Sequence, residues 1–226
     1  MKTKLIHSLF AVSTLLISGT AMAALDANVG LTSNYLFRGL TQTDDGVALQ
    51  GGIDYSHDSG IYVGTWASNV DFGDDTSYEI DFYGGYAGAA GELSYDLGYV
   101  YYAYPDAGAN GESADIDFGE AYLHLGWKYV GVSIIYATNT DDGAEAYDSA
   151  LYYEGNFNYP ISDSLSVGIA VGQQDFDKDN AEDYLNYNLS LTKTTELGDI
   201  TFMVSDTDLD NDDPKVIIGW GYAFSL

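Results

Sequence analysis

The last stretch of the chain, residues 215–226, most strongly limits what this sequence can fold into. Side chains of a β-strand point alternately to its two faces. A strand that faces lipid on one side and a lumen on the other carries large apolar residues on the first face and small ones on the second. The closing stretch has this pattern, with Ile217, Gly219, Gly221, Ala223 and Ser225 on one face and Val216, Ile218, Trp220, Tyr222, Phe224 and Leu226 on the other. Residues 215–226 could alternatively form the closing strand of a soluble β-sandwich. The sequence before them distinguishes between these two interpretations.

Further alternating segments precede this stretch, each of about the 9 to 11 residues that a tilted membrane strand needs. Short links and longer, acid-rich links alternate between them, as in outer-membrane barrels, whose short turns lie at the periplasmic rim. We therefore predict an all-β fold, a twelve-stranded antiparallel transmembrane β-barrel with up-and-down connections and both termini at the short-turn rim. The predicted upstream strands are Ala27–Arg38, Val47–Tyr55, Ile61–Ser68, Tyr78–Tyr86, Leu93–Tyr102, Glu120–Lys128, Val132–Thr138, Leu151–Tyr159, Leu165–Gln173, Leu185–Lys193 and Ile200–Ser205.

A soluble, lipocalin-like barrel would also show alternation. Such a barrel places its apolar residues inside and exposes a face rich in Lys and Glu. In this chain the polar face consists mainly of Asn, Gly, Ser, Thr and Tyr, which suits a lumen, and aromatic residues gather near strand ends, as in the girdles at a membrane interface. The sequence favours the membrane barrel.

Residues 1–23 have the features of a secretory signal peptide. Lys2 and Lys4 provide a basic start, residues 5–18 are mainly apolar, and Ala21-Met22-Ala23 is a small-x-small cleavage site. No later stretch reaches the roughly 18 apolar residues of a spanning helix. We expect the signal to be removed and residues 24–226 to form the barrel in the outer membrane, after export through the periplasm.

The charge balance limits the partners. Two of the seven basic residues lie in the signal, which leaves five against 35 acidic residues and a formal charge of −30. Nucleic acids and anionic lipid headgroups require clustered Lys and Arg, so neither is expected as a partner. The chain has no Cys, which excludes disulfides and thiolate metal sites. Outer-membrane lipid and small hydrophilic solutes or cations are the expected partners, and monomer and homo-oligomer both remain open.

Three motifs in the first half of the chain carry a family resemblance. Residues 32–43 read Thr-Ser-Asn-Tyr-Leu-Phe-Arg-Gly-Leu-Thr-Gln-Thr, residues 51–55 read Gly-Gly-Ile-Asp-Tyr, and residues 59–69 read Ser-Gly-Ile-Tyr-Val-Gly-Thr-Trp-Ala-Ser-Asn. With these motifs the chain resembles the TorF or Gcw_chp family of porin-like proteins. The resemblance is specific over residues 32–105 and architectural beyond them. It implies an outer-membrane barrel with a pore, and it carries no catalytic residue, no cofactor and no established substrate.

Strand parity assigns a set of charged and polar side chains to the lumen. A ring of acids favours cations in a pore, and the strongly negative total charge acts in the same direction. The alternative is that the basic members pair with the acids and fill the lumen with a polar network. Twelve strands lie between the eight that side chains can fill and the sixteen or more of open porins, so we expect a narrow pore. The predicted pore-lining residues are Arg38, Asp54, Glu79, Asp81, Asp96, Glu120, His124, Lys128 and Glu154.

Two runs of alternating Asp are weak candidates for divalent-cation binding, namely Asp175, Asp177 and Asp179, and Asp206, Asp208 and Asp210. Neither run has the Gly at position six and the Glu at position twelve of an EF-hand loop. These runs could bind calcium or magnesium loosely, or they could simply be acidic loops exposed to water. We favour the interpretation as solvated loops.

No catalytic group is predicted. Neither His57 nor His124 has a Ser and an orienting acid at a spacing that indicates a hydrolase. We expect a passive channel for small solutes, either neutral or cationic, without a cofactor. The alternative is a closed structural or adhesive barrel that presents its acidic loops to external partners or divalent cations.

Overall fold

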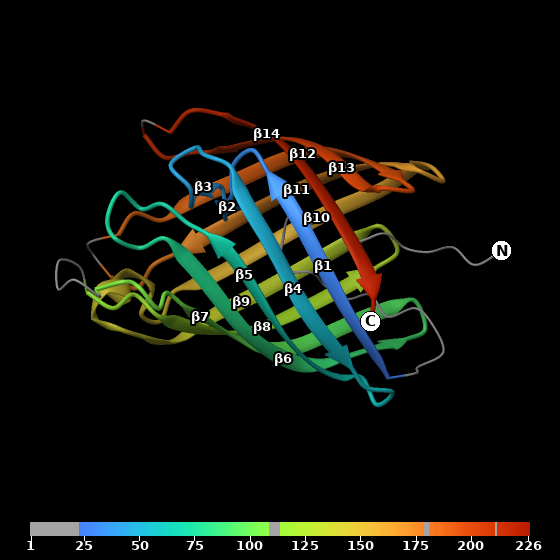
Figure 1. Ribbon diagram of the computed structural model, residues 1–226, viewed down its shortest axis with the longest axis horizontal. Helices are drawn as coiled ribbons and strands as arrows, with labels where there is room; N and C mark the ends of the chain where they lie inside the picture. The colour runs from blue at the N-terminus through green and yellow to red at the C-terminus, as the bar shows by residue number, and fades with distance from the viewer. Residues whose placement is uncertain (1–22, 109–113, 179–180, 211) are drawn as a thin grey trace.

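The computed structural model describes residues 23–226 except 109–113, 179–180 and 211. Within these residues, twelve strands form one closed barrel (Figure 1), which confirms the predicted fold. The predicted signal segment lies outside the described residues except for Ala23. The strands of the wall are β1 (Ala24–Thr32), β4 (Ala48–Ser56), β5 (Ile61–Asn69), β6 (Tyr78–Ala90), β7 (Leu93–Ala103), β8 (Phe118–Trp127), β9 (Val130–Thr140), β10 (Leu151–Ser162), β11 (Leu165–Asp175), β12 (Tyr184–Thr195), β13 (Gly198–Thr207) and β14 (Lys215–Ser225).

Each wall strand pairs antiparallel with the next one along the chain, and β1 pairs with β14 to close the barrel. The closing register runs from Asp26 opposite Ser225 to Thr32 opposite Gly219. Closure leaves no free sheet edge, which is the condition for a sheet in lipid. The register shifts at Gly119/Glu120 and again between Pro160 and Ser162. A shift of this kind locally bends the strand that carries the extra residue.

The two faces of the wall follow the predicted alternation. In the closing strand β14, Val216, Ile218 and Trp220 are exposed to the outside, whereas Ile217 is fully buried in the interior. The same outward exposure of large apolar side chains recurs around the barrel, for example at Leu49, Leu97 and Leu189. The apolar face therefore points toward lipid.

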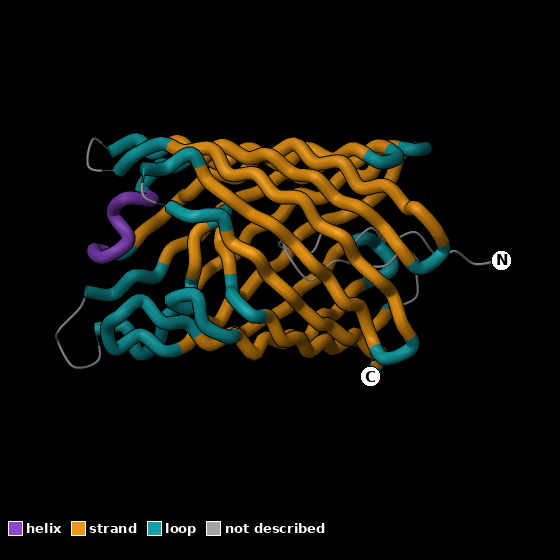
Figure 2. The backbone as a smooth tube through the Cα atoms, turned by 90° about the horizontal axis from the view of Figure 1, so that it is seen from above, coloured by secondary structure: helices purple, strands orange, loops and turns teal. Residues whose placement is uncertain are grey.

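The connections divide the barrel into two different ends (Figure 2). Links of at most four residues join β4 to β5, β6 to β7, β8 to β9, β10 to β11 and β12 to β13 at one end. The long loops, with the short 3-10 helix η1 (Asp142–Tyr147), gather at the other end. The start of β1 and the end of β14 both lie at the short-turn end, as predicted. None of the described residues belongs to a helix that is long and apolar enough to span a membrane.

The first predicted strand is too long. The first strand was expected to continue to Arg38, but β1 ends at Thr32. The Thr32 hydroxyl donates to the carbonyl of Asn34 at 2.8 Å and accepts the Asn34 amide at 3.4 Å, which are local bonds that compete with the strand ladder. The following residues leave the wall and turn into the barrel.

Candidate functional site

The segment between β1 and β4, residues 33–47, folds into the barrel and is named here the inward hairpin. It contains a two-stranded sheet of β2 (Leu36–Phe37) and β3 (Leu40–Thr41). Its turn residues Arg38 and Gly39 both have positive φ, 50° and 91°, as two-residue hairpin turns of type I′ require. A Cβ on Gly39 would come within 2.8 Å of Thr207 Cγ2, so the turn packs directly against the wall at β13.

The tip of the inward hairpin places Arg38 in a buried polar contact with β8 and β11. Its Nη2 donates to both carboxylate oxygens of Glu120 at 2.7 Å, and its Nη1 donates to Gln174 Oε1 at 2.7 Å. The guanidinium also lies over the rings of Phe37 and Tyr152, 4.5 and 4.4 Å from their centroids. The side chains of Arg38 and Glu120 are only 6% and 1% exposed. These five residues are called the Arg38 cluster below.

Aromatic rings fill the space around the Arg38 cluster. Phe37 lies edge-on to Tyr102, Phe118 and Tyr147 at centroid distances of 5.7, 6.4 and 6.3 Å. Phe118 in turn stacks on Tyr102 at 4.5 Å and on Tyr147 at 5.0 Å. Together with buried Tyr152, these rings form a hydrophobic core inside the half of the barrel that carries the long loops. That outer half is a packed region rather than a wide channel.

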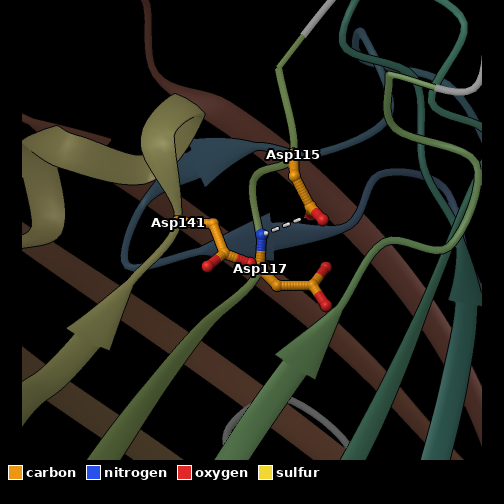
Figure 3. Close-up of side chains that lie close together, drawn as sticks. All are labelled: Asp115, Asp117 and Asp141. Atoms are coloured by element: carbon orange, nitrogen blue, oxygen red, sulfur yellow. Dashed lines mark hydrogen bonds between the residues drawn. The ribbon is translucent and has the colours of Figure 1, made fainter.

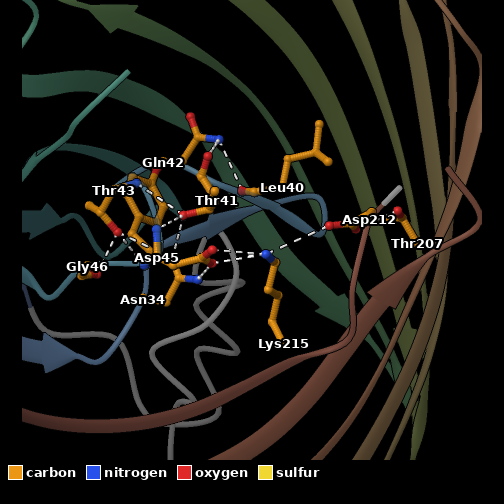
Figure 4. Close-up of polar contacts among 11 residues, drawn as sticks. Asn34, Leu40, Thr41, Gln42, Thr43, Asp45, Gly46, Thr207, Asp212 and Lys215 are labelled. Carbon is orange, nitrogen blue, oxygen red and sulfur yellow. Dashed lines mark hydrogen bonds and ion pairs between the residues drawn. The ribbon is translucent and has the colours of Figure 1, made fainter. Parts of the chain in front are cut away.

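The base of the inward hairpin is held by short polar contacts (Figure 4). Asn34 Nδ2 donates to Asp45 Oδ1 and Thr41 Oγ1 donates to Asn34 Oδ1, both at 2.7 Å. Lys215 Nζ, at the start of β14, lies 3.1 Å from Asp45 and 3.9 Å from Asp212. The hairpin is thus fixed to the barrel at its base as well as at its tip.

A second polar cluster lies in the interior on β5, β7 and β8. Tyr62 Oη donates to Asp96 Oδ1 at 2.7 Å and lies 2.5 Å from Tyr122 Oη. His124 is buried next to this group, and its Nδ1 lies 2.8 Å from Ser133 Oγ. Asp96 faces His124 across the strand pair, yet its carboxylate accepts from Tyr62. Among the described residues, no hydrogen bond joins His124 to an acid that would orient it as in a hydrolytic triad.

Two further acids, Glu79 and Asp81, are buried on the inner face of β6. Tyr35 Oη of the inward hairpin donates to Glu79 Oε1 at 3.0 Å. This bond is a third attachment of the hairpin, to a wall strand that neither the tip nor the base reaches.

The remaining predicted interior acids are satisfied by neighbouring polar groups. Asp54 on β4 accepts from Tyr83 Oη at 2.5 Å and from Asn28 Nδ2 at 3.4 Å. Glu154 on β10 accepts from Tyr152 Oη at 3.0 Å. Polar side chains thus continue along the inner face outside the Arg38 cluster.

Three carboxylates meet at the long-loop rim (Figure 3). Oxygens of Asp115, Asp117 and Asp141 lie within 4.8 Å of one another. Partial desolvation and the charges of Asp115, Asp117 and Asp142 raise the pKa of Asp141. Asp115 and Asp141 are exposed, whereas Asp117 is half-buried and accepts from the Tyr101 hydroxyl and the Tyr104 amide. The three residues belong to the acidic rim.

Comparison with known proteins identifies the family. A family model described as "Bacterial protein of unknown function (Gcw_chp)" matches residues 18–219. The chain belongs to the Gcw_chp family. This confirms the resemblance seen in the sequence motifs. No protein with a curated description matches the Gcw_chp chain.

Solved porin structures share the fold of this Gcw_chp protein at low sequence identity. The KdgM porin has a TM-score of 0.56 at 9% identity, and the KdgM porin in complex with disordered oligogalacturonate has 0.58 at 10%. The NanC porin has 0.50 at 12%. Each comparison covers 90% of this chain and 99% of the other. At such identities the likeness concerns the barrel alone.

The motif that carried the family resemblance builds the inward hairpin of the Gcw_chp barrel. Residues 32–43 contain its two short strands, its turn and most of its base. Strand parity assigned Arg38 to the inner face of a continuous strand, whereas Arg38 lies in the turn of the inward hairpin, beyond the end of β1. The inward turn was missed. Its signal was the break in alternation at the consecutive apolar residues Leu36 and Phe37, followed by Arg-Gly, which suits a tight turn.

One predicted lumen residue is misplaced. Lys128 was assigned to the end of an inward-facing strand, but β8 ends at Trp127 and Lys128 lies in the turn to β9 with φ of 55°. Its side chain is 47% exposed and pairs with Glu92 of the neighbouring turn at 3.4 Å. Lys128 therefore belongs to the short-turn rim. The prediction failed because side chains alternate between two faces only within a strand, and Lys128 lies in a turn.

The other predicted lumen residues lie on the inner face of the wall or, for Arg38, in the inward hairpin. They are Arg38, Asp54, Glu79, Asp81, Asp96, Glu120, His124 and Glu154. Their role in lining a pore stays a prediction.

The two predicted Asp runs are not grouped as expected in the described part of the chain. Asp175 ends β11, Asp177 follows it in a loop, and Asp179 lies outside the described residues. Asp206 receives the Thr207 amide at 3.0 Å, Asp208 receives the Leu185 amide at 2.7 Å, and Asp210 is exposed. Asp206 and Asp208 thus accept backbone amides. The carboxylates that do meet come from two different loops, which spacing along one run could not indicate.

Proposed function

We propose that this protein is an outer-membrane channel for passive diffusion of small neutral or cationic solutes, with the inward hairpin as its constriction. The closed barrel, its apolar outside and its likeness to porins support a channel in the outer membrane. The observation that carries the selectivity is the charge of the interior. Arg38 is committed to Glu120, and among the described residues no ion pair reaches Asp96 or Glu154.

An acidic interior acts differently on different solutes. A ring of carboxylates raises the local concentration of cations and repels anions. Oligogalacturonate, named with one of the similar porins, is a polyanion. Similar barrel geometry therefore does not carry that solute over to this chain, whose interior acids would oppose it.

The hairpin limits the size of what passes. Its tip contacts β8, β10, β11 and β13, so a solute must pass beside it or displace it. The Arg38 cluster and the aromatic rings occupy the outer half. In the half with the short turns, β11 and β12 carry small polar residues such as Ser166, Ser190 and Thr192 on the inner face, whereas β5 and β8 carry the larger buried Tyr62 and His124. We infer that the constriction lies at the inward hairpin.

The deciding experiment is conductance of the refolded protein in a planar bilayer under a salt gradient. We expect discrete steps whose reversal potential lies toward the cation equilibrium value. The double variant Asp96→Asn/Glu154→Gln should reduce this preference, while the rim variant Asp115→Asn/Asp117→Asn/Asp141→Asn should largely keep it. Equal selectivity of the inner variant and the wild type would contradict the assigned pore lining.

The filled outer half also favours the second candidate, a closed barrel that presents acidic loops. Replacing residues 35–42 by a short Gly-Ser link separates the two. A channel constricted by the hairpin should conduct more when the hairpin is shortened. No conductance from either protein, when circular dichroism and heat-modifiable gel mobility show a folded barrel, would contradict the channel and favour the closed barrel.

A further inference from the structure

Glu79 and Asp81 form a buried acidic pair that the proposed channel does not require. They are two positions apart on β6 and point to the same inner face. Glu79 is 1% exposed and Asp81 is 8% exposed. The charge of the Glu79 carboxylate acts directly on Asp81. Two carboxylates so close together in a buried place cannot both be charged without compensation.

The described surroundings provide little compensation. Glu79 Oε1 accepts from Tyr35, and the Tyr104 side chain also lies near the Glu79 carboxylate. Glu79 Oε2 and Asp81 Oδ1 are nevertheless buried, and neither has a hydrogen-bond partner of normal geometry among the described residues. None of the ion pairs in this part of the chain involves either acid. Arg38 is bound to Glu120, and Glu120 itself adds negative charge close to Asp81.

Buried charges in proteins are paired with opposite charges or bind metal ions. Hard divalent cations prefer carboxylate oxygens, and two carboxylates balance the charge of one such ion. We propose that Glu79 and Asp81 bind one calcium-type divalent cation inside the barrel, through the unpartnered oxygens Glu79 Oε2 and Asp81 Oδ1. The site lies next to Tyr35 of the inward hairpin and is separate from the acidic rim.

The site would also act on the hairpin. A cation that fixes the Glu79 carboxylate fixes the acceptor of the Tyr35 hydroxyl, so binding would stabilise the inward position of the hairpin. The site requires only the folded barrel, and its existence does not depend on conduction.

Calcium binding to the refolded full-length mature barrel, first stripped with a chelator, tests the site by titration calorimetry with calcium chloride. We expect one site whose affinity falls at least tenfold in Glu79→Gln/Asp81→Asn. The matched control is the rim variant Asp115→Asn/Asp117→Asn/Asp141→Asn, which should keep that site. Equal calcium binding by the inner variant and the wild type would overturn the proposal. So would a protonated-carboxyl infrared band that is present with saturating calcium and absent from the inner variant, because a shared proton would then occupy the pair.

A second measurement needs no variant and covers the case in which the inner variant does not fold. Terbium bound to the wild type should be excited through the nearby tyrosines, and its lifetimes in light and heavy water report how many waters remain on the ion. A buried site should retain few of them. Luminescence only from an ion with a nearly full water shell would place the binding at the rim and overturn the proposal. Neither calorimetry nor terbium luminescence depends on conductance. Failure of the proposed channel can therefore be distinguished from failure of the proposed cation site.

Discussion

Arg38 shows how one residue can decide the state of the interior. Its guanidinium provides both a charge partner for Glu120 and a flat surface for two rings. Lysine could provide the charge but not the two-nitrogen contact to Glu120 and Gln174, because its donors lie on one atom. The positive φ of Arg38 is unfavourable for a residue with a side chain, and the contacts at the tip offset this cost.

Replacing Arg38 tests this role. Arg38→Met should destabilise the refolded barrel by roughly 3 to 5 kcal/mol, because it leaves the Glu120 carboxylate buried without its charge partner. The double variant Arg38→Met/Glu120→Gln should recover much of the loss. Urea unfolding in lipid vesicles measures both. Equal destabilisation of the single and double variants would show that Arg38 stabilises the hairpin through packing alone.

The wall strands show what alternation can and cannot predict. Large apolar residues at every second position were sufficient to predict twelve strands, their closure and the separation of short turns from long loops. Their boundaries were less certain, since the period of two continues into residues that leave the wall. Asn34 and Arg38 fit a longer strand by parity, yet both lie in the inward hairpin. The turn at Arg38 is held by contacts with Glu120 and Gln174, which lie 82 and 136 residues away along the chain. A pattern read within one strand cannot predict contacts over such distances.

The same limit applies to the clusters of the candidate site. Parity placed Asp96 and His124 inside, but the partners Tyr62 and Ser133 depend on which strands are neighbours and in what register. The rim carboxylates Asp115 and Asp141 come from separate loops. A pattern along one strand predicts a face, whereas a site needs the pairing of several strands.

The register of β12 can be tested by substitutions on its two faces. Leu189, in the middle of β12, is 53% exposed on the lipid side, and its neighbour Asn188 points inward. Leu189→Arg should cost about 2 to 4 kcal/mol in a bilayer if it lies near the midplane. Asn188→Lys should change the unfolding free energy within about 0.5 kcal/mol, because the lumen side is polar. Unfolding by urea in vesicles gives both values, and the reverse order would contradict the observed register.

At the scale of the whole molecule, the charge is distributed unevenly. Of the 35 acidic residues, 21 lie in the six long loops, so one end of the barrel is strongly negative. Few basic groups offset them there, among them Lys178, which pairs with Asp148 at 2.7 Å and lowers the pKa of that acid. Such self-repulsion destabilises the folded state and is weakened by salt.

The raised pKa of Asp141 shows in which direction the repulsion among the loop acids changes stability with pH. The folded protein holds the Asp141 proton more tightly than the unfolded chain, whose value is about 3.8. This acid therefore reduces stability as pH rises through the interval above that value. Asp141→Asn should raise the unfolding midpoint at pH 7, and the gain should vanish near pH 3, where the acid is protonated in both states. A gain that persists at pH 3 would mean that the charge of Asp141 is not its cause.

The inward hairpin also has a consequence for the order of assembly. It is made early in the chain, yet its tip is held by strands that lie 82 to 136 residues later. Contacts over such separations require large loops to close and form late in folding. The tip contacts therefore cannot form until β8 and β11 stand in the wall, and the inward hairpin has no fixed place before then. The aromatic packing and the Arg38 cluster are thus a final step, and they mainly slow unfolding rather than speed folding.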